Sequence, residues 1–514
     1  MHHELILILD FGSQYTQLIA RRVREQGVYC EIQPFHYPLE KIIDRKPKGM
    51  ILSGGPNSVY ERDAPQISED FYKEIDAPIL GICYGMQLLA KDLRGEVSPS
   101  DNHEYGHAKL KVLSGETRLF ESLPFELDVW MSHGDHVTNL PDGFHTTATT
   151  GDVITAIENT EKRIFGLQFH PEVSHTPLGK EILRNFLSTI CQCKGDWTSA
   201  SFIKEETEKI RALVGETDNV VCGLSGGVDS TVAAVLVHEA IDDRQTCIFV
   251  NNGLLRADEF GDTLKLYEEK LHLNVRGVDA SGEFYASLKG ITEPETKRKN
   301  IGRKFIEVFD AEAQKIGGVK YLVQGTLYPD VIESVSLHGA SVTIKSHHNV
   351  GGLPEKMNLK LIEPLRELFK DEVRLIGKDL GIPDEILQRH PFPGPGMAVR
   401  ILGEVTEEKV KLLQAVNRVF DDELKKQNLY NEVWQAFPVL LPLETVGVMG
   451  YFRTYEKVVA LRAITSTDGM TADWARLPFE FLAKVSSRIT AEVRGVNRVV
   501  YDITSKPPGT IEWE

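Results

Sequence analysis

The sequence predicts an α/β protein with two doubly wound α/β domains followed by a smaller α+β domain. Continuous aliphatic runs such as Leu5–Leu9 and Val220–Leu224 end in glycine-rich or polar turns, as fully buried parallel strands do. Helical stretches separate these runs, and the series begins again near residue 205. The residues after Arg400 alternate helices with short apolar strands and lack such turns. We therefore expect domains at residues 1–195, 196–389 and 390–514.

Composition limits the classes of function that this chain can have. It is 41% hydrophobic and 26% charged, which is typical of globular proteins. With 58 basic and 75 acidic residues it carries a net charge of −17 and no concentrated basic block, which argues against nucleic acid as a main partner. The N-terminus has no positive region and its apolar run is short, so we expect neither a signal peptide nor a membrane anchor. The six cysteines show no C-x-x-C spacing, which favours a reduced, cytoplasmic protein.

In the first domain, each aliphatic run leads into a polar turn. Leu5–Leu9 ends at the sequence DFGS, and a helix is expected over Tyr15–Glu25. Met50–Leu52 ends at SGGP, and Pro78–Ile82 ends at Cys83. Because functional groups in a doubly wound sheet gather at the carboxyl ends of its strands, these turns are the first candidates for a site.

The motif GICYGMQ places Cys83 between glycines where a strand passes into a helix. The same arrangement lifts the serine of G-x-S-x-G hydrolases clear of the sheet, and the start of a helix favours a thiolate over a thiol. The alternative for this motif alone is a buried cysteine in a tight turn.

A base for this thiol is found in FHPEV, which follows a strand expected over Arg163–Phe169 and paired with Val153–Glu158. His170 and Glu172 are two residues apart and project to the same side of an extended chain, so the carboxylate can orient the imidazole. Taken alone, His-Pro-Glu also suits a structural role. His133-Gly-Asp135 is expected to form a polar turn that can line a pocket.

Five segments occur in an order that resembles the class I glutamine amidotransferases: DFGSQYTQLIARRVRE, ILSGGPNSV, GICYGMQ, MSHGDHV and GLQFHPEV. In that family a cysteine attacks the side-chain amide of glutamine, ammonia leaves, and water cleaves the glutamyl thioester. The resemblance implies that Cys83 is the nucleophile, His170 the base and Glu172 the group that orients it. It also implies that the backbone N–H groups of Gly55 and Tyr84 form the oxyanion hole.

The second α/β series contains GLSGGVDST, Gly223–Thr231, between a strand and a helix. A glycine turn before a helix directs free N–H groups at phosphate, but the lysine of common phosphate loops is replaced here by Asp229. The alternative is a glycine turn without a ligand. Other strands of this domain are expected at Thr246–Val250, Leu273–Val278 and Tyr321–Gln324.

The segment SGGVDS resembles the pyrophosphatase loop of the N-type ATP pyrophosphatases, which cleave ATP between its α- and β-phosphates. The resemblance implies that the loop binds ATP and that Asp229 holds Mg²⁺, which bridges phosphate oxygens and stabilises the departing charge. The ATP-binding residues are then Ser225, Gly226, Gly227, Val228, Asp229, Ser230 and Thr231.

Several later segments carry polar or charged side chains. A helix expected over Glu293–Phe305 holds a basic cluster that either forms a solvated face or binds a nucleotide phosphate. Ile344–Pro354 is expected to form a mobile lid, and the proline-rich Arg389–Gly396 a domain junction. The prolines in the tail, Lys506–Glu512, argue against a helix there.

With the C-terminal KPPGTIEWE, these segments resemble the glutamine-hydrolysing GMP synthetase family over essentially the whole chain. In that family ATP adenylates the C2 oxygen of xanthosine 5′-monophosphate (XMP), and ammonia displaces AMP to give GMP. The resemblance implies glutamine, ATP and XMP as substrates and a homodimer formed through the last domain. It assigns five residues to XMP: Arg298, Lys345, Gln435, Lys506 and Glu512.

Two positions depart from the family pattern. Asn251 stands where an aspartate is usual, which lowers the negative charge near the ATP loop, and Tyr451 replaces another aspartate. Two alternatives remain at this point. One is an NAD synthetase or a tRNA thiolase, although the Glu-Lys-Cys glutaminase of the first is not evident and the second should be more basic. The other is a glutamine or nucleotide sensor with dead sites, which the intact set of Cys83, His170 and Glu172 argues against.

Overall fold

The computed structural model describes the chain except for residues 1–2, 69, 114–116, 335–358, 450–451 and 467–470. It divides into two compact units. The first consists of Met1–Glu205 with Val331–Ile344, and the second of Glu206–Asp330 with Lys345–Glu514. Each unit is described by itself below. Arg389 and His390 belong to the same unit, so the expected boundary between residues 389 and 390 stays a prediction.

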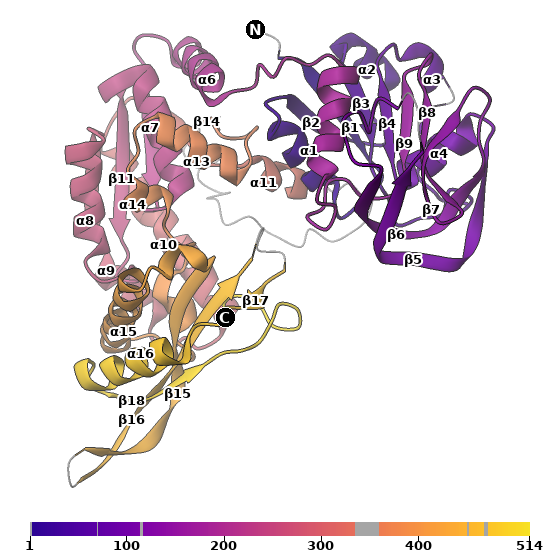
Figure 1. Cartoon of the computed structure of the whole chain (residues 1–514). Coiled ribbons are helices and arrows are strands. Elements are labelled where there is room, and N and C mark those ends of the chain that lie inside the picture. Colours follow the sequence, from indigo (N-terminus) through magenta and orange to yellow (C-terminus); the bar gives the residue numbers. More distant parts are fainter. Residues whose placement is uncertain (1–2, 69, 114–116, 335–358, 450–451, 467–470) are drawn as a thin grey trace. The chain divides into compact units, whose positions relative to one another are not determined.

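The first unit is built on a nine-stranded sheet of order β2-β1-β3-β4-β9-β8-β7-β5-β6 (Figure 1). The five strands from β2 to β9 are parallel, and the sheet continues with antiparallel strands. The strands are β1 (Leu5–Asp10), β2 (Tyr29–Pro34), β3 (Gly49–Leu52), β4 (Ile79–Ile82), β5 (Glu96–Val112), β6 (Glu126–Asn139), β7 (His145–Thr150), β8 (Val153–Asn159) and β9 (Ile164–Leu167). The helices are α1 (Thr16–Arg24), α2 (Leu39–Arg45), α3 (Phe71–Glu74), α4 (Tyr84–Asp92), α5 (Gly179–Arg184) and η1 (Asn185–Ile190).

Three of the parallel strands, β1, β3 and β4, form where the sequence predicts them, because they are covered on both faces, whereas β2 was not predicted and is only partly buried. Every residue of β1, β3 and β4 is buried. The predicted hairpin is also confirmed, since β8 pairs antiparallel with β9 and places Ile157 opposite Gly166. One expectation is wrong: His133 and Asp135 lie inside β6 rather than in a turn. Burial alternates along the first half of β6, so this strand has a covered face and a more open one, and His133 lies on the covered face.

The second unit contains a five-stranded parallel sheet of order β12-β11-β10-β13-β14. The strands expected from the sequence are present, although β12 begins two residues later than expected. The strands are β10 (Asn219–Leu224), β11 (Gln245–Asn251), β12 (Val275–Asp279), β13 (Val319–Val323) and β14 (Lys360–Ile362). The helices are α6 (Ser199–Val214), which begins in the first unit, α7 (Val228–Ile241), η2 (Asp242–Arg244), α8 (Glu259–Lys265), η3 (Leu266–Lys270), α9 (Ser281–Leu288), α10 (Pro294–Gln314), α11 (Tyr328–Ser334), which ends in the first unit, α13 (Lys370–Asp379) and α14 (Asp384–Leu387).

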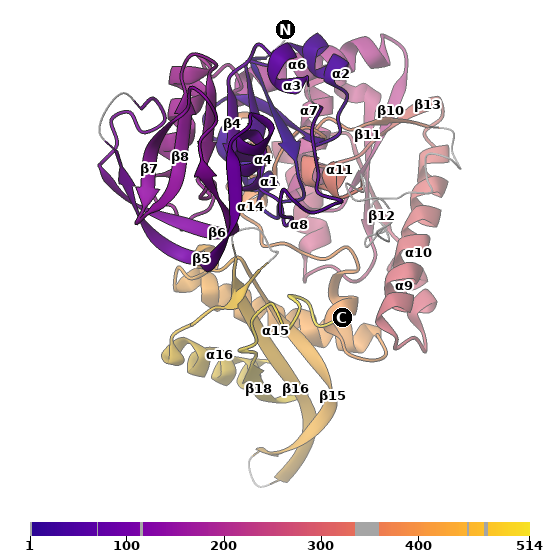
Figure 2. The same cartoon turned by 90° about the vertical axis from the view of Figure 1, so that its right-hand side faces the viewer.

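The C-terminal part of this unit carries a long antiparallel ribbon, drawn in yellow and orange in Figures 1 and 2. Its two strands pair along most of their length, and β18 joins β16 in parallel. The strands are β15 (Gln435–Met449), β16 (Phe452–Thr465), β17 (Asp473–Trp474) and β18 (Val496–Tyr501). The helices are η4 (Gly396–Arg400), α15 (Glu407–Lys426), η5 (Tyr430–Glu432) and α16 (Phe479–Glu492).

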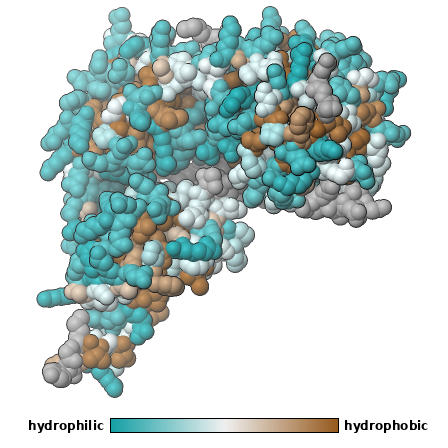
Figure 3. Space-filling view, viewed as in Figure 1, coloured by the Kyte–Doolittle hydropathy of each residue, from teal (hydrophilic) through white to brown (hydrophobic). Residues whose placement is uncertain are grey.

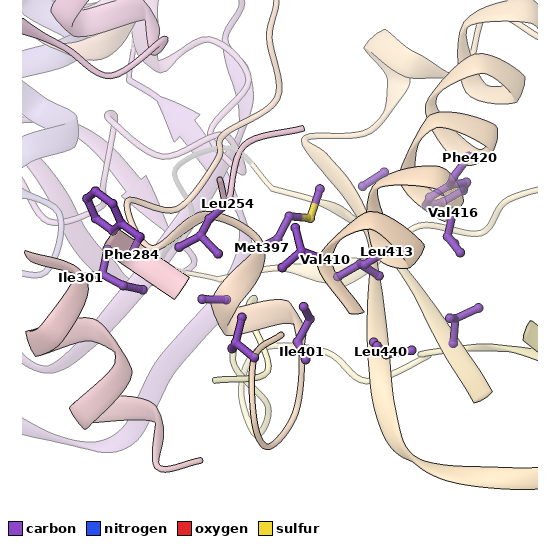
Figure 4. Packing of buried hydrophobic residues seen from close by; sticks show 14 of the residues in the cluster. Leu254, Phe284, Ile301, Met397, Ile401, Val410, Leu413, Val416, Phe420 and Leu440 are labelled. Atoms are coloured by element: carbon purple, nitrogen blue, oxygen red, sulfur yellow. The ribbon is translucent and has the colours of Figure 1, made fainter. Parts of the chain in front are cut away.

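One hydrophobic core joins the parallel sheet to the C-terminal part of the second unit. Leu254, Phe284 and Ile301 belong to the same cluster as Met397 and Leu440 (Figure 4). Burial of such side chains contributes roughly 1.5–3 kcal/mol each, which explains why these two regions form one unit. Among the helices that the structure describes, none has the length and apolar character needed to cross a membrane.

Candidate active sites

Cys83 occupies a strained turn between β4 and α4. Its backbone has φ +50° and ψ −107°, a positive φ that residues other than glycine rarely adopt. The flanking glycines make this turn possible. A Cβ on Gly81 would lie 2.4 Å from the Leu89 side chain, and one on Gly85 would lie 2.3 Å from the carbonyl oxygen of Leu52. The turn therefore presents the thiol at the end of the sheet, as the motif predicts.

His170 and Glu172 form a buried pair in the segment after β9. The Nδ1 atom of His170 lies 2.7 Å from a carboxylate oxygen of Glu172, and both side chains are almost completely buried. Burial opposes a charge on the imidazole, but the Glu172 carboxylate and hydrogen bonds with Cys83 and Glu172 raise the pKa of His170 well above its usual value. The carboxylate thus fixes the imidazole and favours its protonated form.

The two halves of this candidate site meet at Gly54. A Cβ there would lie 3.2 Å from Cε1 of His170 and 3.7 Å from Cβ of Cys83, so Gly54 occupies the space between them. The next residue, Gly55, lies beside Tyr84, the residue that follows Cys83. A Cβ added to Gly55 would lie 3.3 Å from Cγ of Tyr84. The N–H of Tyr84 is in the first turn of α4, where N–H groups have no acceptor within the helix. The structure therefore brings together all five residues expected at this site.

Sequence reasoning did not single out the amides that surround the thiol. Nε2 of Gln168 lies 3.8 Å from Sγ of Cys83, and Sγ lies 3.7 Å from the carbonyl oxygen of Ser132. Gln87 connects Gln168 to β6 through a 2.8 Å hydrogen bond to the carbonyl of Asp135. Gln87 lies in the motif GICYGMQ and Gln168 in GLQFHPEV. A neutral glutamine in a motif does not by itself indicate a role in catalysis.

His133 lies in the same region of β6. It is buried, and burial lowers the pKa of its imidazole to about 4. His133 is therefore neutral near pH 7 and is not a second base of the kind that His170 represents.

The predicted ATP loop connects β10 to α7 and is held by its own hydroxyl groups. Gly226 has φ +78°, which glycine adopts without strain. The N–H of Ser225 donates to Oγ of Ser230 at 3.3 Å, and the buried hydroxyl of Thr231 donates to the carbonyl of Gly227 at 2.8 Å. Val228 begins α7, whose free N–H groups form the anion-binding end of the helix.

Asp229 has one carboxylate oxygen in contact with a cation and one without a partner. Oδ2 lies 3.5 Å from Nζ of Lys370, whereas Oδ1 is buried and lacks a hydrogen-bond partner in the described part of the chain. Arg389 also reaches this loop and donates to the carbonyl of Gly226 at 3.1 Å. Sequence reasoning missed both cations. Arg389 at least begins the proline-rich segment Arg389–Gly396, but Lys370 lies in an ordinary helical pattern.

Among the residues that the structure describes, no group of three or more His, Cys, Asp and Glu side chains is placed to hold a metal ion. The departure at Asn251 has a local explanation: its amide donates to a carboxylate oxygen of Asp279 at 3.2 Å. An aspartate at this position would set two carboxylates against each other.

The C-terminal tail is docked in a polar site of the second unit and, as its prolines predict, is not helical. Glu512 accepts two hydrogen bonds from Arg400, at 2.8 and 3.1 Å, and one from Gln435 at 2.9 Å. The Arg400 guanidinium is 1% exposed. A second buried arginine, Arg462, donates to the backbone oxygens of Thr510 and Ile511.

The last residue of the tail is bound by the basic helix α10. The fully buried Lys297 donates to the carboxylate of Glu514, and Arg298 donates to its backbone oxygen. Burial lowers the pKa of Lys297, because it disfavours the charged ammonium. The tail thus brings Arg298, Gln435 and Glu512 into one region.

The remaining expected XMP residues are placed only in part. Lys506 pairs through its backbone with Ala472, at 2.7 and 3.1 Å, beside the same tail. Lys345, the predicted lid Ile344–Pro354 and Tyr451 lie outside the described residues.

Three protein families match successive parts of the chain. The family described as "Glutamine amidotransferase class-I" matches residues 7–190, "NAD synthase" matches residues 199–308, and "GMP synthase C terminal domain" matches residues 422–513. The residues matched to NAD synthase include the loop Ser225–Thr231.

Relatives align over the entire length. A protein named "GMP synthase [glutamine-hydrolyzing]" from Carboxydothermus hydrogenoformans is 57% identical and covers 99% of both chains. Proteins with the same name from Cytophaga hutchinsonii and Aquifex aeolicus are also 57% identical, with 99–100% of each chain covered.

Proposed function

The chain belongs to the family of glutamine-hydrolysing GMP synthases, and from that premise we propose how its residues divide the reaction. The enzyme makes GMP from XMP, with ATP as co-substrate and glutamine as the nitrogen donor. The observation that carries the assignment of residues is the contact between the buried His170–Glu172 pair and Cys83 at the strained turn.

In the first half-reaction, we assign proton transfer to His170 and nucleophilic attack to Cys83. His170 takes the thiol proton, and Sγ attacks the side-chain amide carbon of glutamine. The N–H groups of Gly55 and Tyr84 would stabilise the oxyanion, a contribution worth roughly 3–4 kcal/mol per donor in comparable sites. His170 then returns the proton to the departing ammonia, and water cleaves the thioester to glutamate. Glu172 holds the imidazole throughout.

In the second half-reaction, we assign the phosphates of ATP to the loop Ser225–Thr231. The C2 oxygen of XMP attacks the α-phosphorus, and pyrophosphate leaves while it is held by N–H and hydroxyl groups of the loop. Ammonia then attacks C2, and AMP departs with the oxygen to give GMP. Lys370 and Arg389 supply positive charge beside the loop, which a phosphate loop without its usual lysine requires.

The residues of this loop fit a magnesium ion. Oδ1 of Asp229 is a buried carboxylate oxygen that lacks a hydrogen-bond partner in the described chain, and Mg²⁺ prefers such oxygen ligands. We therefore propose that Asp229 holds Mg²⁺ together with phosphate oxygens of ATP. The bound ion would neutralise charge on the departing pyrophosphate.

For XMP we propose Arg298, Lys345, Gln435, Lys506 and Glu512. The support is the convergence of the tail on one polar region through the contacts of Arg298, Gln435 and Glu512. We expect the cationic side chains to bind the phosphate of XMP, because opposite charges attract. The amide of Gln435 and the carboxylate of Glu512 would bind the base or the ribose of XMP.

We also propose a homodimer formed through the C-terminal ribbon. Apolar side chains near its tip are open to solvent: Val448 is 74% exposed and Phe452 78%. Brown, hydrophobic surface is visible along the ribbon in Figure 3. Such exposure is typical of a contact surface in the assembled protein. The six cysteines are buried and free, which supports the proposal of a cytoplasmic location.

The direct test supplies ATP, Mg²⁺, XMP and glutamine and measures GMP, AMP, pyrophosphate and glutamate. Equal amounts of the four products are expected, and omission of XMP should stop pyrophosphate formation. Pyrophosphate release with another acceptor in place of XMP would contradict the assignment of the nucleotide site.

A further inference from the structure

A chain of amide groups connects β6 to the nucleophile and lies outside the His170–Glu172 pair. Nε2 of Gln87 donates to the carbonyl of Asp135 at 2.8 Å and to Oε1 of Gln168 at 3.4 Å. Nε2 of Gln168 in turn lies 3.8 Å from Sγ of Cys83. Gln168 is 0% exposed and Gln87 is 3% exposed, so no solvent competes for these groups.

The direction of this chain is fixed by its first member. A backbone carbonyl can only accept, so Gln87 must turn its NH₂ group toward Asp135. The second hydrogen of that NH₂ group then reaches Oε1 of Gln168. With its oxygen engaged, Gln168 must turn its own NH₂ group toward Cys83. The orientation of the Gln168 amide therefore follows from the hydrogen bonds and not from the assignment of its atoms alone.

An N–H group directed at sulfur distinguishes the two forms of Cys83. The neutral thiol can donate to the carbonyl of Ser132, 3.7 Å away, and gains little from a second donor. A thiolate is a pure acceptor, so an N–H at this position stabilises it. Because Cys83 and Gln168 are buried, this interaction is stronger than it would be in solution.

We propose that Gln168 is a catalytic residue of the glutaminase site, which donates an N–H to the Cys83 thiolate and is held in that orientation by Gln87. The proposal rests on the proposed role of Cys83. When His170 accepts the thiol proton, the sulfur exchanges its bond to Ser132 for the amide of Gln168. No bond to Gln168 is made or broken in the reaction, and its contribution is to the charged sulfur alone.

The test replaces Gln168 by methionine, which has a similar volume and no N–H donor. We measure the rate of alkylation of Cys83 by iodoacetamide from pH 5 to 9, with Cys83→Ala as the blank for the buried cysteines. We expect the midpoint of the alkylation profile to move to higher pH. The kcat for glutamine hydrolysis should fall about 10- to 100-fold with little change in KM, because removal of one hydrogen-bond donor to a charged group lowers a rate by about this factor.

The control is Thr155→Val, a buried and nearly isosteric change on β8. The backbone carbonyl of Thr155 accepts a hydrogen bond from the backbone N–H of Gln168 at 2.8 Å, and valine keeps that carbonyl. This variant should retain both the alkylation profile and kcat. Gln87→Met should move the profile in the same direction as Gln168→Met, because it releases the Gln168 amide. Thermal unfolding and circular dichroism check the fold of every variant, because ammonia-dependent GMP synthesis depends on the second unit and bypasses the first.

An unchanged alkylation profile in Gln168→Met would overturn the proposal, as would equal effects of Gln168→Met and Thr155→Val. A different result would show that the proposed role of Cys83 is itself wrong. If wild-type protein hydrolyses glutamine at the rate of Cys83→Ala, Cys83 itself is not the nucleophile.

Discussion

The carboxylate of Glu172 lies 2.7 Å from Nδ1 of His170, and the two side chains are 0% and 4% exposed. They are only two positions apart, with Glu172 in the turn that follows β9, so the local backbone places them side by side. Because no solvent reaches the pair, removal of the carboxylate leaves the imidazole free to rotate and without its counter-charge.

We expect Glu172→Gln to lower glutamine-dependent GMP formation by about 10²- to 10⁴-fold, as loss of the orienting carboxylate does in other triads. Ammonia-dependent synthesis should be preserved. The control is Glu161→Gln, an exposed change in the turn before β9. Steady-state rates with each nitrogen source measure both effects. A variant that keeps more than half of its glutaminase activity would contradict the role of Glu172.

Cys83→Ala should abolish glutamine-dependent synthesis and leave the ammonia-dependent reaction largely intact. The nucleophile and the ATP loop belong to separate compact units, so ammonia from solution bypasses the first site. The comparison requires an excess of ammonium salt at a pH where free ammonia is present. Loss of both activities in a folded variant would contradict the division into two sites.

Asp229→Asn should remove most adenylation with either nitrogen source and raise the Mg²⁺ concentration needed for the remaining activity. The change keeps the size of the side chain but removes the charge from the buried Oδ1. Asp243→Asn, an exposed change beyond the opposite end of α7, is the matched control. Pyrophosphate release against Mg²⁺ concentration is the measurement. If Asp229→Asn shows the wild-type dependence on Mg²⁺ concentration, Asp229 does not bind Mg²⁺ and serves only as an acidic residue in the first turn of α7.

Glu512→Gln should raise the KM for XMP by about 10- to 100-fold without affecting glutamine hydrolysis at Cys83. A lost charge-assisted hydrogen bond corresponds to this range. Glutamine in place of Glu512 still accepts a bond from Arg400, whereas deletion of the tail would leave that buried cation and Lys297 without their carboxylates. The single change is therefore preferable to a truncation. Glu480→Gln, exposed at the start of α16, is the control.

The buried His390 should make the second unit sensitive to acid. Burial lowers its pKa to about 4, and the nearby charges of Arg256, Lys425 and Arg400 act in the same direction. As the pH falls, His390 takes up a proton near pH 6.5 in the unfolded chain but only near pH 4 in the folded chain. The free energy of unfolding therefore decreases as the pH drops from 6.5 toward 4. Between pH 7 and pH 5 the loss is about 2 kcal/mol.

The corresponding variant is His390→Gln, which does not titrate and can still donate to the carbonyl of Tyr430, as Nε2 of His390 does at 2.7 Å. Its thermal unfolding should depend less on pH than that of the wild type between pH 7 and pH 5. Identical pH dependence in the two proteins would show that His390 makes no contribution. The buried His133 titrates in the same range but belongs to the other unit, so its contribution is common to both proteins.

Local sequence determined the features that depend on short separations along the chain. The buried strands are visible because both faces are covered, and Cys83 is visible because its flanking glycines permit the strained turn. The hairpin of β8 and β9 follows from a short turn between apolar runs. The ribbon was recognised only in part: its apolar segments were predicted, but backbone pairing continues through polar residues that carry no strand signal of their own.

The tertiary structure alone decided the contacts between residues far apart in sequence. Gln168 reaches Cys83 across 85 positions, Lys370 reaches Asp229 across 141, and Lys297 reaches Glu514 across 217. A lysine or glutamine in a helix or strand has the same local pattern whether it faces solvent or a buried charge. Its role is set by the groups that the folded chain brings within hydrogen-bond distance, and burial strengthens the contacts of Gln168 and Lys297 because water no longer competes for them.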